Sequence, residues 1–291
     1  VAIGKDALIA NTTASNNTAV GMDALTTNTT GHSNTASGVN ALLLNTTGTQ
    51  NTALGMGSLT FNQTASHNTA VGFNSLNANT TGTQNVAVGA SALDANTTAS
   101  YNTAIGEKSL STNILGSKST AVGTFALFNQ NPASAGDMYN VAVGYDAGNA
   151  VTTASALTLI GGDAGVGLTT GHNNTLIGFN AGNYSVVLAT GITNTIIGSY
   201  AYTSATDTNQ ANVFGHAVAG AGGYTTLGLT TNDIRAAHGN VTWATVSDER
   251  YKKDIVDSTA GLSFINALQP RTFKYKNLGE LPETFNAYKA D

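Results

Sequence analysis

The chain has 291 residues, of which only 9% are charged and 7% aromatic, and its formal net charge is −5. In ordinary globular domains about a quarter of the residues are charged. This composition, rich in Gly, Asn, Thr and Ala, therefore disfavours a typical enzyme and favours a repeat architecture. The chain has no basic stripe for nucleic acid, no cysteine for a disulfide or thiolate metal site, and no apolar run long enough for membrane insertion.

A short phrase of the form Asn-Thr-Ala-Val-Gly, followed by two variable residues and Ala/Ser-Leu, recurs from the start of the chain. The first eight of its marker glycines are separated by 17 residues, and the later spacing is looser. The thirteen marker glycines are Gly4, Gly21, Gly38, Gly55, Gly72, Gly89, Gly106, Gly123, Gly144, Gly161, Gly178, Gly198 and Gly215. Short units of this kind bury their apolar faces only by stacking. The sequence therefore predicts an all-β solenoid or β-roll of about thirteen rungs over residues 1–220, where a rung is one repeat unit.

Each rung is predicted to hold two short strands and two turns. Thr18 and Val20 should share one face of the first strand while Ala19 takes the other, because side chains alternate along a strand. The segment 23–25 should form the second strand and supply one large apolar residue per rung, and the segment 28–31 has turn chemistry. Stacking should then bury the apolar face in columns such as Ile3, Val20, Leu54 and Val71.

One asparagine recurs at the same place in the turn of successive rungs. Stacked asparagines can form an amide ladder along a fibre, and the alternative is that they line a ligand surface. The members of this column are Asn11, Asn28, Asn45, Asn62, Asn79, Asn96 and Asn113. The ladder is the favoured interpretation.

Later rungs carry extra residues, and the segments 131–139 and 150–157 are expected to bulge from the rod. Loops on a rigid scaffold are common places for binding, and tyrosine rings can stack on a glycan. No receptor-binding residue is assigned, but the stacking candidates are Tyr139, Tyr145, Tyr184, Tyr200 and Tyr202. Acidic residues and histidines are scattered along the shaft without the spacing of a glycosidase or metal site, so no metal and no cofactor is expected.

A solenoid with so little apolar content should leave strand edges and an Ala-rich flank uncovered, and three chains packed about an axis would cover them. The phrases Val1-Ala2-Ile3-Gly4 and Thr18-Ala19-Val20-Gly21 resemble the left-handed β-roll repeats in the heads of trimeric autotransporter adhesins. That resemblance implies a trimeric, left-handed roll. The 17-residue step is longer than the usual repeat of those heads.

Beyond the repeat, residues 221–246 are expected to form a transition module. The stretch Ser247-Asp248-Glu249-Arg250-Tyr251-Lys252-Lys253-Asp254-Ile255 and the apolar pattern that follows it to Lys276 are similar to the intramolecular chaperone autoprotease of phage tailspikes and fibres, the endosialidase type. Residues 247–291 are expected to be the N-terminal part of this small α+β domain, with a short helix over 261–268 and a strand over 272–276. The alternative for an isolated Ser-Asp pair ahead of basic residues is a helix N-cap or a turn.

The resemblance to the chaperone implies that the domain trimerises the fibre and then cuts the chain between Val246 and Ser247. Ser247 would be the nucleophile and Lys252 its base, within the motif that also contains Asp248, Arg250, Lys253 and Ile255. A serine hydroxyl needs such a base, and a lysine serves only when its pKa is lowered by burial or by neighbouring cations. No activity on an external substrate is expected.

The sequence thus predicts a structural viral fibre, located in the virion as a tail fibre or appendage and used for host attachment. Expected partners are two further copies of the chain, other virion proteins and a glycan or protein receptor on the host surface, with no nucleic acid and no membrane insertion. The alternative is a bacterial trimeric surface adhesin. An adhesin of that type should end in a coiled coil and a membrane-anchoring β-barrel segment, whereas the residues after Ser247 follow the chaperone motif.

Overall fold

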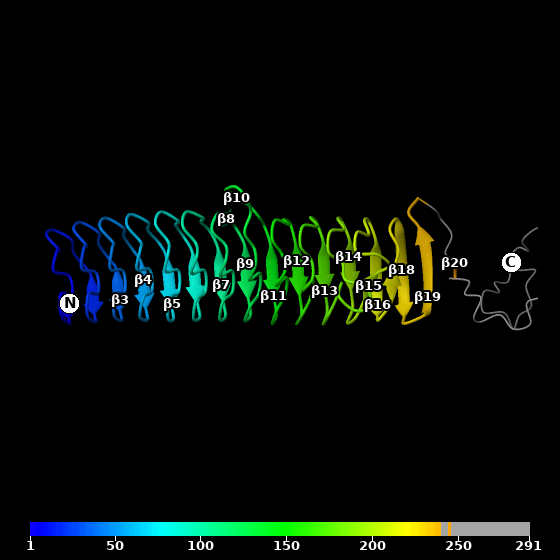
Figure 1. Ribbon diagram of the computed structural model, residues 1–291, viewed down its shortest axis with the longest axis horizontal. Helices are drawn as coiled ribbons and strands as arrows, with labels where there is room; N and C mark the ends of the chain where they lie inside the picture. Colours follow the sequence, from blue (N-terminus) through cyan, green and yellow to red (C-terminus); the bar gives the residue numbers. More distant parts are fainter. Residues whose placement is uncertain (240–243, 246–291) are drawn as a thin grey trace, which may run out of the picture. The chain divides into compact units, whose positions relative to one another are not determined.

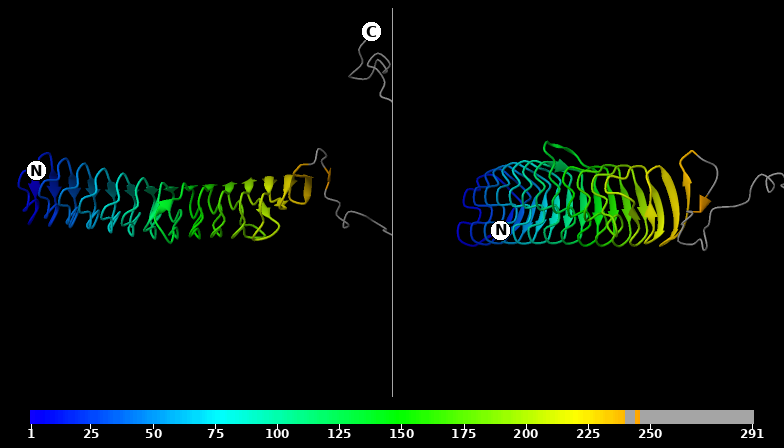
Figure 2. Two further views of the ribbon diagram at one scale, coloured as in Figure 1. Left: turned by 90° about the horizontal axis from the view of Figure 1, so that it is seen from above. Right: turned by 45° about the vertical axis from the view of Figure 1, so that its right-hand side comes forward.

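The structure, a computed structural model, describes residues 1–239 and 244–245. These residues form strands and turns and contain no helix, and so no helix long and apolar enough to cross a membrane. The chain divides into two units, Val1–Val246 and Ser247–Asp291. The first unit is a β-solenoid of about thirteen turns with a 17-residue repeat, as the sequence predicts, and its rungs stack side by side along one axis (Figures 1 and 2).

The described strands form one long sheet and two small pairs. In the long sheet, neighbouring strands are parallel from β1 to β18, and β18, β19 and β20 are antiparallel. Its members, in spatial order, are β1 (Ala2–Ile3), β2 (Thr18–Val20), β3 (Thr35–Ser37), β4 (Thr52–Leu54), β5 (Thr69–Val71), β6 (Val86–Val88), β7 (Thr103–Ile105), β9 (Thr120–Val122), β11 (Val141–Val143), β12 (Thr158–Ile160), β13 (Thr175–Ile177), β14 (Thr195–Ile197), β16 (Asn212–His216), β18 (Tyr224–Leu229), β19 (Asn232–Ala237) and β20 (Ala244–Thr245). The two pairs are β8 (Gly116–Ser117) with β10 (Gly136–Asp137), and β15 (Tyr202–Thr203) with β17 (Ala219–Gly220).

A repeat of the regular shaft has one strand, and the predicted second strand over 23–25 is wrong. That segment is a tight turn in which Asp23 and Leu25 both have left-handed backbone conformations, with φ of 57° and 52°. The left-handed conformation costs a leucine about 1–2 kcal/mol. Leu25 is nevertheless fully buried, and burial of a leucine side chain contributes about 1.5–3 kcal/mol, which offsets that cost.

The predicted column of Ile3, Val20, Leu54 and Val71 exists, but the prediction that it is buried is wrong. Strand pairing aligns Ile3 with Val20 and Leu54 with Val71, yet these side chains face outward. The strand's middle residue, Ala19 and its equivalents, is the buried one. The interior between strand and turn is narrow, so Ala on the strand and Leu on the turn fill it together.

The predicted amide ladder is confirmed for most of its length. Asn45 Nδ2 donates to Asn28 Oδ1 over 2.8 Å and to the carbonyl of Gly48 over 3.0 Å, and Asn28, Asn62, Asn79 and Asn96 make the corresponding bonds. The ladder breaks at Asn113, which keeps its bond to Gly116 O but makes none to Asn96, so the buried Asn96 Oδ1 has no partner among the described residues.

A second buried amide column, which the sequence analysis missed, runs beside the first. Here the backbone N–H makes the bond between rungs: Asn34 N–H donates to Asn17 Oδ1 over 2.9 Å, and Asn34 Oδ1 accepts from the backbone N–H of Asn51 over 2.9 Å. Asn34 Nδ2 donates to Gly48 O over 2.8 Å. In the early rungs the two columns therefore share one acceptor carbonyl, such as Gly48 O, which satisfies polar groups that would be costly to bury alone.

The core changes composition along the shaft. The turn leucine of the early rungs is replaced by Gly148, Gly165 and Gly182 in later ones, and the strand alanine by Leu159, Leu176 and Ile196, which are fully buried. A Cβ on Gly165 would lie 2.9 Å from Leu176 Cδ1 and 3.0 Å from Leu159 Cδ2. The large side chain has moved from the turn to the strand, and the core volume stays filled.

The segment 131–139 leaves the regular coil as predicted, and its strand β10 pairs in parallel with β8 (Figure 1). The predicted bulge at 150–157 is wrong. The marker glycines that flank that segment, Gly144 and Gly161, are 17 residues apart, and Val151 and Leu157 point into the core at places that asparagines occupy in earlier rungs. Apolar residues replace the amides there without adding length.

Each marker glycine has a φ between 129° and 141°, a conformation that side chains oppose, and its backbone lies directly against the next rung. A Cβ on Gly72 would lie 2.6 Å from the carbonyl oxygen of Gly89. Substitution of a marker glycine must therefore displace backbone as well as strain it.

We expect Gly72→Ala to lower the free energy of unfolding by about 3 kcal/mol or more, because backbone strain and a backbone clash act together. Gly136→Ala is the matched control, since its φ is not positive and a Cβ there would meet no atom within 4 Å. Thermal unfolding followed by circular dichroism measures both. Equal melting temperatures for Gly72→Ala and wild type would show that a side chain is tolerated at the marker glycine.

Candidate functional site

The residues predicted to cut the chain lie outside the described residues. These are Val246, Ser247, Asp248, Arg250, Lys252, Lys253 and Ile255, together with the helix expected over 261–268 and the strand over 272–276. Their roles stay predictions. The described shaft offers three surface features instead: the outward face of the long sheet, a polar cluster at the bulge, and a group of aromatic rings.

The outward face of the long sheet is built from the first and third residues of each strand. From β2 to β16 the first residue is Thr, Val or Asn and the third is Val, Leu, Ile or Phe, with Ser37 as the exception, and no residue in either column is charged. The exposed fraction is 37–40% for the third-position residues Val20, Leu54, Ile105, Val143, Ile160 and Ile197. The column continues onto the closing hairpin, where Phe214 pairs with Leu227 and Leu227 with Ile234.

This face is unusual for a solvated surface because it is uncharged over its whole length. About thirteen rungs at about 4.8 Å each make an uncharged stripe about 60 Å long. Protein surfaces usually interleave charges of both signs, and the shaft's charged residues lie elsewhere, for example at Asp23, Lys108 and Asp146 in the turns. The predicted Ala-rich flank is wrong, because the strand alanines are inside and this Thr/Val/Ile face takes its place.

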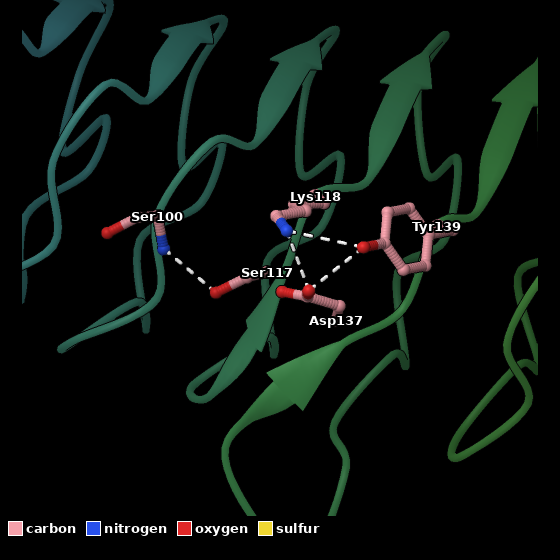
Figure 3. A network of polar contacts seen from close by, with 5 residues as sticks. All are labelled: Ser100, Ser117, Lys118, Asp137 and Tyr139. Carbon is pink, nitrogen blue, oxygen red and sulfur yellow. Dashed lines mark hydrogen bonds and ion pairs between the residues drawn. The ribbon is translucent and has the colours of Figure 1, made fainter.

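At the bulge, three polar side chains form a closed triangle (Figure 3). Lys118 Nζ donates to Asp137 Oδ2 over 2.7 Å and to Tyr139 Oη over 3.2 Å, and Tyr139 Oη donates to the same carboxylate oxygen over 3.0 Å. Asp137 comes from β10 in the bulge and Tyr139 from the end of the same segment, where it takes the place that Lys118 has in the rung before. The triangle therefore fastens the bulge to the rung beneath it.

The ion pair is favourable for both charged groups. The hydrogen bond to Asp137, followed by that to Tyr139, raises the pKa of the Lys118 ammonium above its usual value. The bond from Lys118 and then that from Tyr139 lower the pKa of the Asp137 carboxyl below its usual value. The triangle thus holds one cation and one anion, and its net charge is zero at neutral pH.

The five tyrosines named as stacking candidates separate into three places. Tyr184, Tyr200 and Tyr202 come together with Phe179 and His216, with ring centroids 5.0–5.8 Å apart from their neighbours. The other two lie apart: Tyr145 packs edge to face against Phe125 at 6.3 Å, and Tyr139 belongs to the polar triangle. Sugar binding at any of them remains a prediction.

The sequence analysis did not identify three residues of this region as candidates: Tyr101, Lys118 and Asp137. A signal for two of them exists, because Tyr101, Lys118 and Tyr139 each precede a marker glycine by five residues and so occupy the same place in successive rungs. The place of Asp137 depends on the path of the bulge, which has no repeat to predict it.

Comparison with known proteins adds one finding about the second unit. Residues 247–287 match the family described as Chaperone of endosialidase. This match begins at Ser247 and covers 41 of the 291 residues (287 − 247 + 1). No curated protein and no solved structure matches the chain. A β-solenoid followed by this chaperone segment fits an endosialidase-type fibre.

We expect Asp137→Asn to speed amide hydrogen exchange in residues 131–137 by about tenfold, because the bulge loses its charged anchor. Asp207→Asn, at an exposed position elsewhere in the shaft, is the control and should leave that exchange unchanged. Since the folded pKa of Asp137 is lowered, the anchor is fully present above its usual value of 3.8 and is lost as the pH falls through the lowered pKa. Equal exchange in wild type and Asp137→Asn at neutral pH would show that the triangle does not hold the bulge.

Proposed function

We propose that this chain is the shaft and assembly module of a viral tail fibre or appendage, which works as a homotrimer in host attachment. The observation that carries the proposal is the order of the two units, a repeat-built β-solenoid followed directly by a segment that matches the Chaperone of endosialidase family. Such a shaft stacks non-local β pairing over many rungs, which folds slowly and exposes apolar surface. A chaperone at one end would set the register of three chains.

The outward face of the long sheet supports the homotrimer. An uncharged apolar stripe of this length on a free monomer would favour aggregation, and closed symmetry is the usual way to cover such a face. Three copies with their stripes toward a common axis would bury the Val and Ile column of each chain. The rungs of identical chains have the same spacing, so their columns can match along the whole length.

We further propose that the chaperone segment leaves by self-cleavage. The Ser247 hydroxyl attacks the carbonyl carbon of Val246, with Lys252 accepting the hydroxyl proton. The peptide bond between the two residues breaks, the proton goes to the released amine of Ser247, and the acyl group is held as an ester. Water then hydrolyses that ester to the Val246 carboxylate and the free hydroxyl. Loss of the chaperone would make trimer assembly kinetically irreversible.

A bacterial trimeric surface adhesin is the second candidate, because the shaft repeat resembles adhesin heads. The match of residues 247–287 to the chaperone family favours the viral fibre over it.

The proposal is tested by running full-length wild type beside Ser247→Ala on denaturing gels, with heated and unheated lanes, and by mass spectrometry of the bands. We expect wild type to lose the piece after Val246 and to run as a trimer when unheated, and Ser247→Ala to form the trimer but stay intact. Lys253→Ala is the matched control for a basic residue of the motif with no proposed proton-transfer role. An intact wild type would refute the cleavage, and a monomer in the unheated lane would refute the trimer.

A further inference from the structure

The polar triangle at the bulge contains one exposed aromatic ring, Tyr139, and a second exposed ring, Tyr101, occupies the equivalent place one rung before Lys118. Tyr101, Lys118 and Tyr139 stand two residues before β7, β9 and β11, which pair with one another in register, so the three side chains follow one another along the shaft. All three have left-handed backbones, with φ of 64°, 60° and 53°. Tyr101 is 55% exposed and Tyr139 57%.

This place differs from the equivalent places in most other rungs. The same column carries Asn16, Ser33, Gln50, His67, Gln84, Ala156, Asn173, Thr193 and Gln210 in the remaining rungs, so no other run of neighbours combines two rings and a charge. The step between Gly123 and Gly144 is four residues longer than the regular step of 17 (21 − 17), and the bulge that these residues form places Asp137 against Lys118. The buried core of the shaft does not include Lys118, Asp137 or Tyr139.

The triangle retains unused hydrogen-bonding capacity. A lysine ammonium has three N–H donors, and those of Lys118 reach two partners, Asp137 and Tyr139, among the described residues. The Asp137 oxygen Oδ1 receives no hydrogen bond from the described residues, since both bonds go to Oδ2. One donor and one acceptor are therefore left beside the Tyr139 ring, where Lys118 Nζ lies 5.2 Å from the ring centroid.

We propose that Tyr101, Lys118, Asp137 and Tyr139 form a binding site for a neutral hexose of a host-surface glycan. The exposed Tyr101 ring, and the face of Tyr139 opposite Lys118, offer flat apolar surfaces for the C–H face of a pyranose. The free donor of Lys118 and the free acceptor of Asp137 suit a pair of adjacent hydroxyls, one accepting and one donating. Lys118 and Asp137 neutralise each other, so the site gives no net attraction to an acidic sugar. This proposal deepens the attachment role proposed above by naming its receptor chemistry.

The probe is a printed panel of short linear homo-oligomers of glucose, mannose and galactose, with acidic oligosaccharides printed beside them. The labelled full chain is applied to this panel. The neutral oligomer that binds most strongly is then titrated against variants by calorimetry. We expect Tyr139→Ala and Asp137→Asn each to weaken binding by about tenfold or more. Two controls should bind as wild type does: Gln50→Ala, at the equivalent place in a distant rung, and Tyr184→Ala, in the other aromatic group.

The proposal is overturned by any of three results: no neutral oligomer binds, only acidic oligomers bind, or Tyr139→Ala and Asp137→Asn bind the neutral oligomer as tightly as wild type. Unheated gels of every protein report the trimer separately. A trimer that binds no neutral sugar refutes this site and leaves the fibre standing, and a monomer that binds the sugar refutes the trimer and leaves the site standing.

Discussion

The shaft depends on one constraint: at each marker glycine, backbone packs directly on the backbone of the next rung. Each marker glycine has a φ that other residues oppose, and a Cβ on Gly21 would lie 2.5 Å from the carbonyl of Gly38. Because each marker glycine admits no side chain, successive rungs follow the same path at this point, even where the bulge at 131–139 leaves the coil between two marker glycines. Strands then pair in register, and each side chain meets its own equivalent from the next rung. Columns of like residues follow directly.

Those columns explain how so little apolar material makes a stable interior. Asparagine above asparagine satisfies both amide groups, and Gly48 O accepts from Asn34 and Asn45 together. Alanine above alanine leaves space that Leu25 and its equivalents fill from the turn. Where the strand residue becomes Leu159 or Leu176, the turn residue becomes glycine, so total core volume is conserved while its source moves. The same stacking also repeats outward residues, which is why one face is uncharged from β2 to β16.

The sequence predicts the solenoid, its period and the first amide ladder, because these depend only on which residues recur at which spacing. It does not predict the single strand per repeat, since a leucine such as Leu25 in a left-handed conformation gives no propensity signal. Nor does it predict which strand face is buried, because hydrophobicity favours Val20 over Ala19. A signal was nevertheless present: the joint replacement of Leu by Gly165 and of Ala by Leu159 indicates that turn and strand meet in one core. The polar triangle depends on the path of the 131–139 bulge, which no repeat specifies.

The central claim is that the outward face of the sheet is where copies of the chain meet, and its most direct test is solvent access to that face. The chain has no cysteine, so Val143→Cys and Gln84→Cys each introduce a single thiol, the first on the face and the second at an exposed position away from it. The rate of maleimide labelling is measured in the native full-length protein. The account predicts that Gln84→Cys reacts freely while Val143→Cys is protected until the protein is unfolded. Equal rapid labelling of both thiols in the native protein would contradict it.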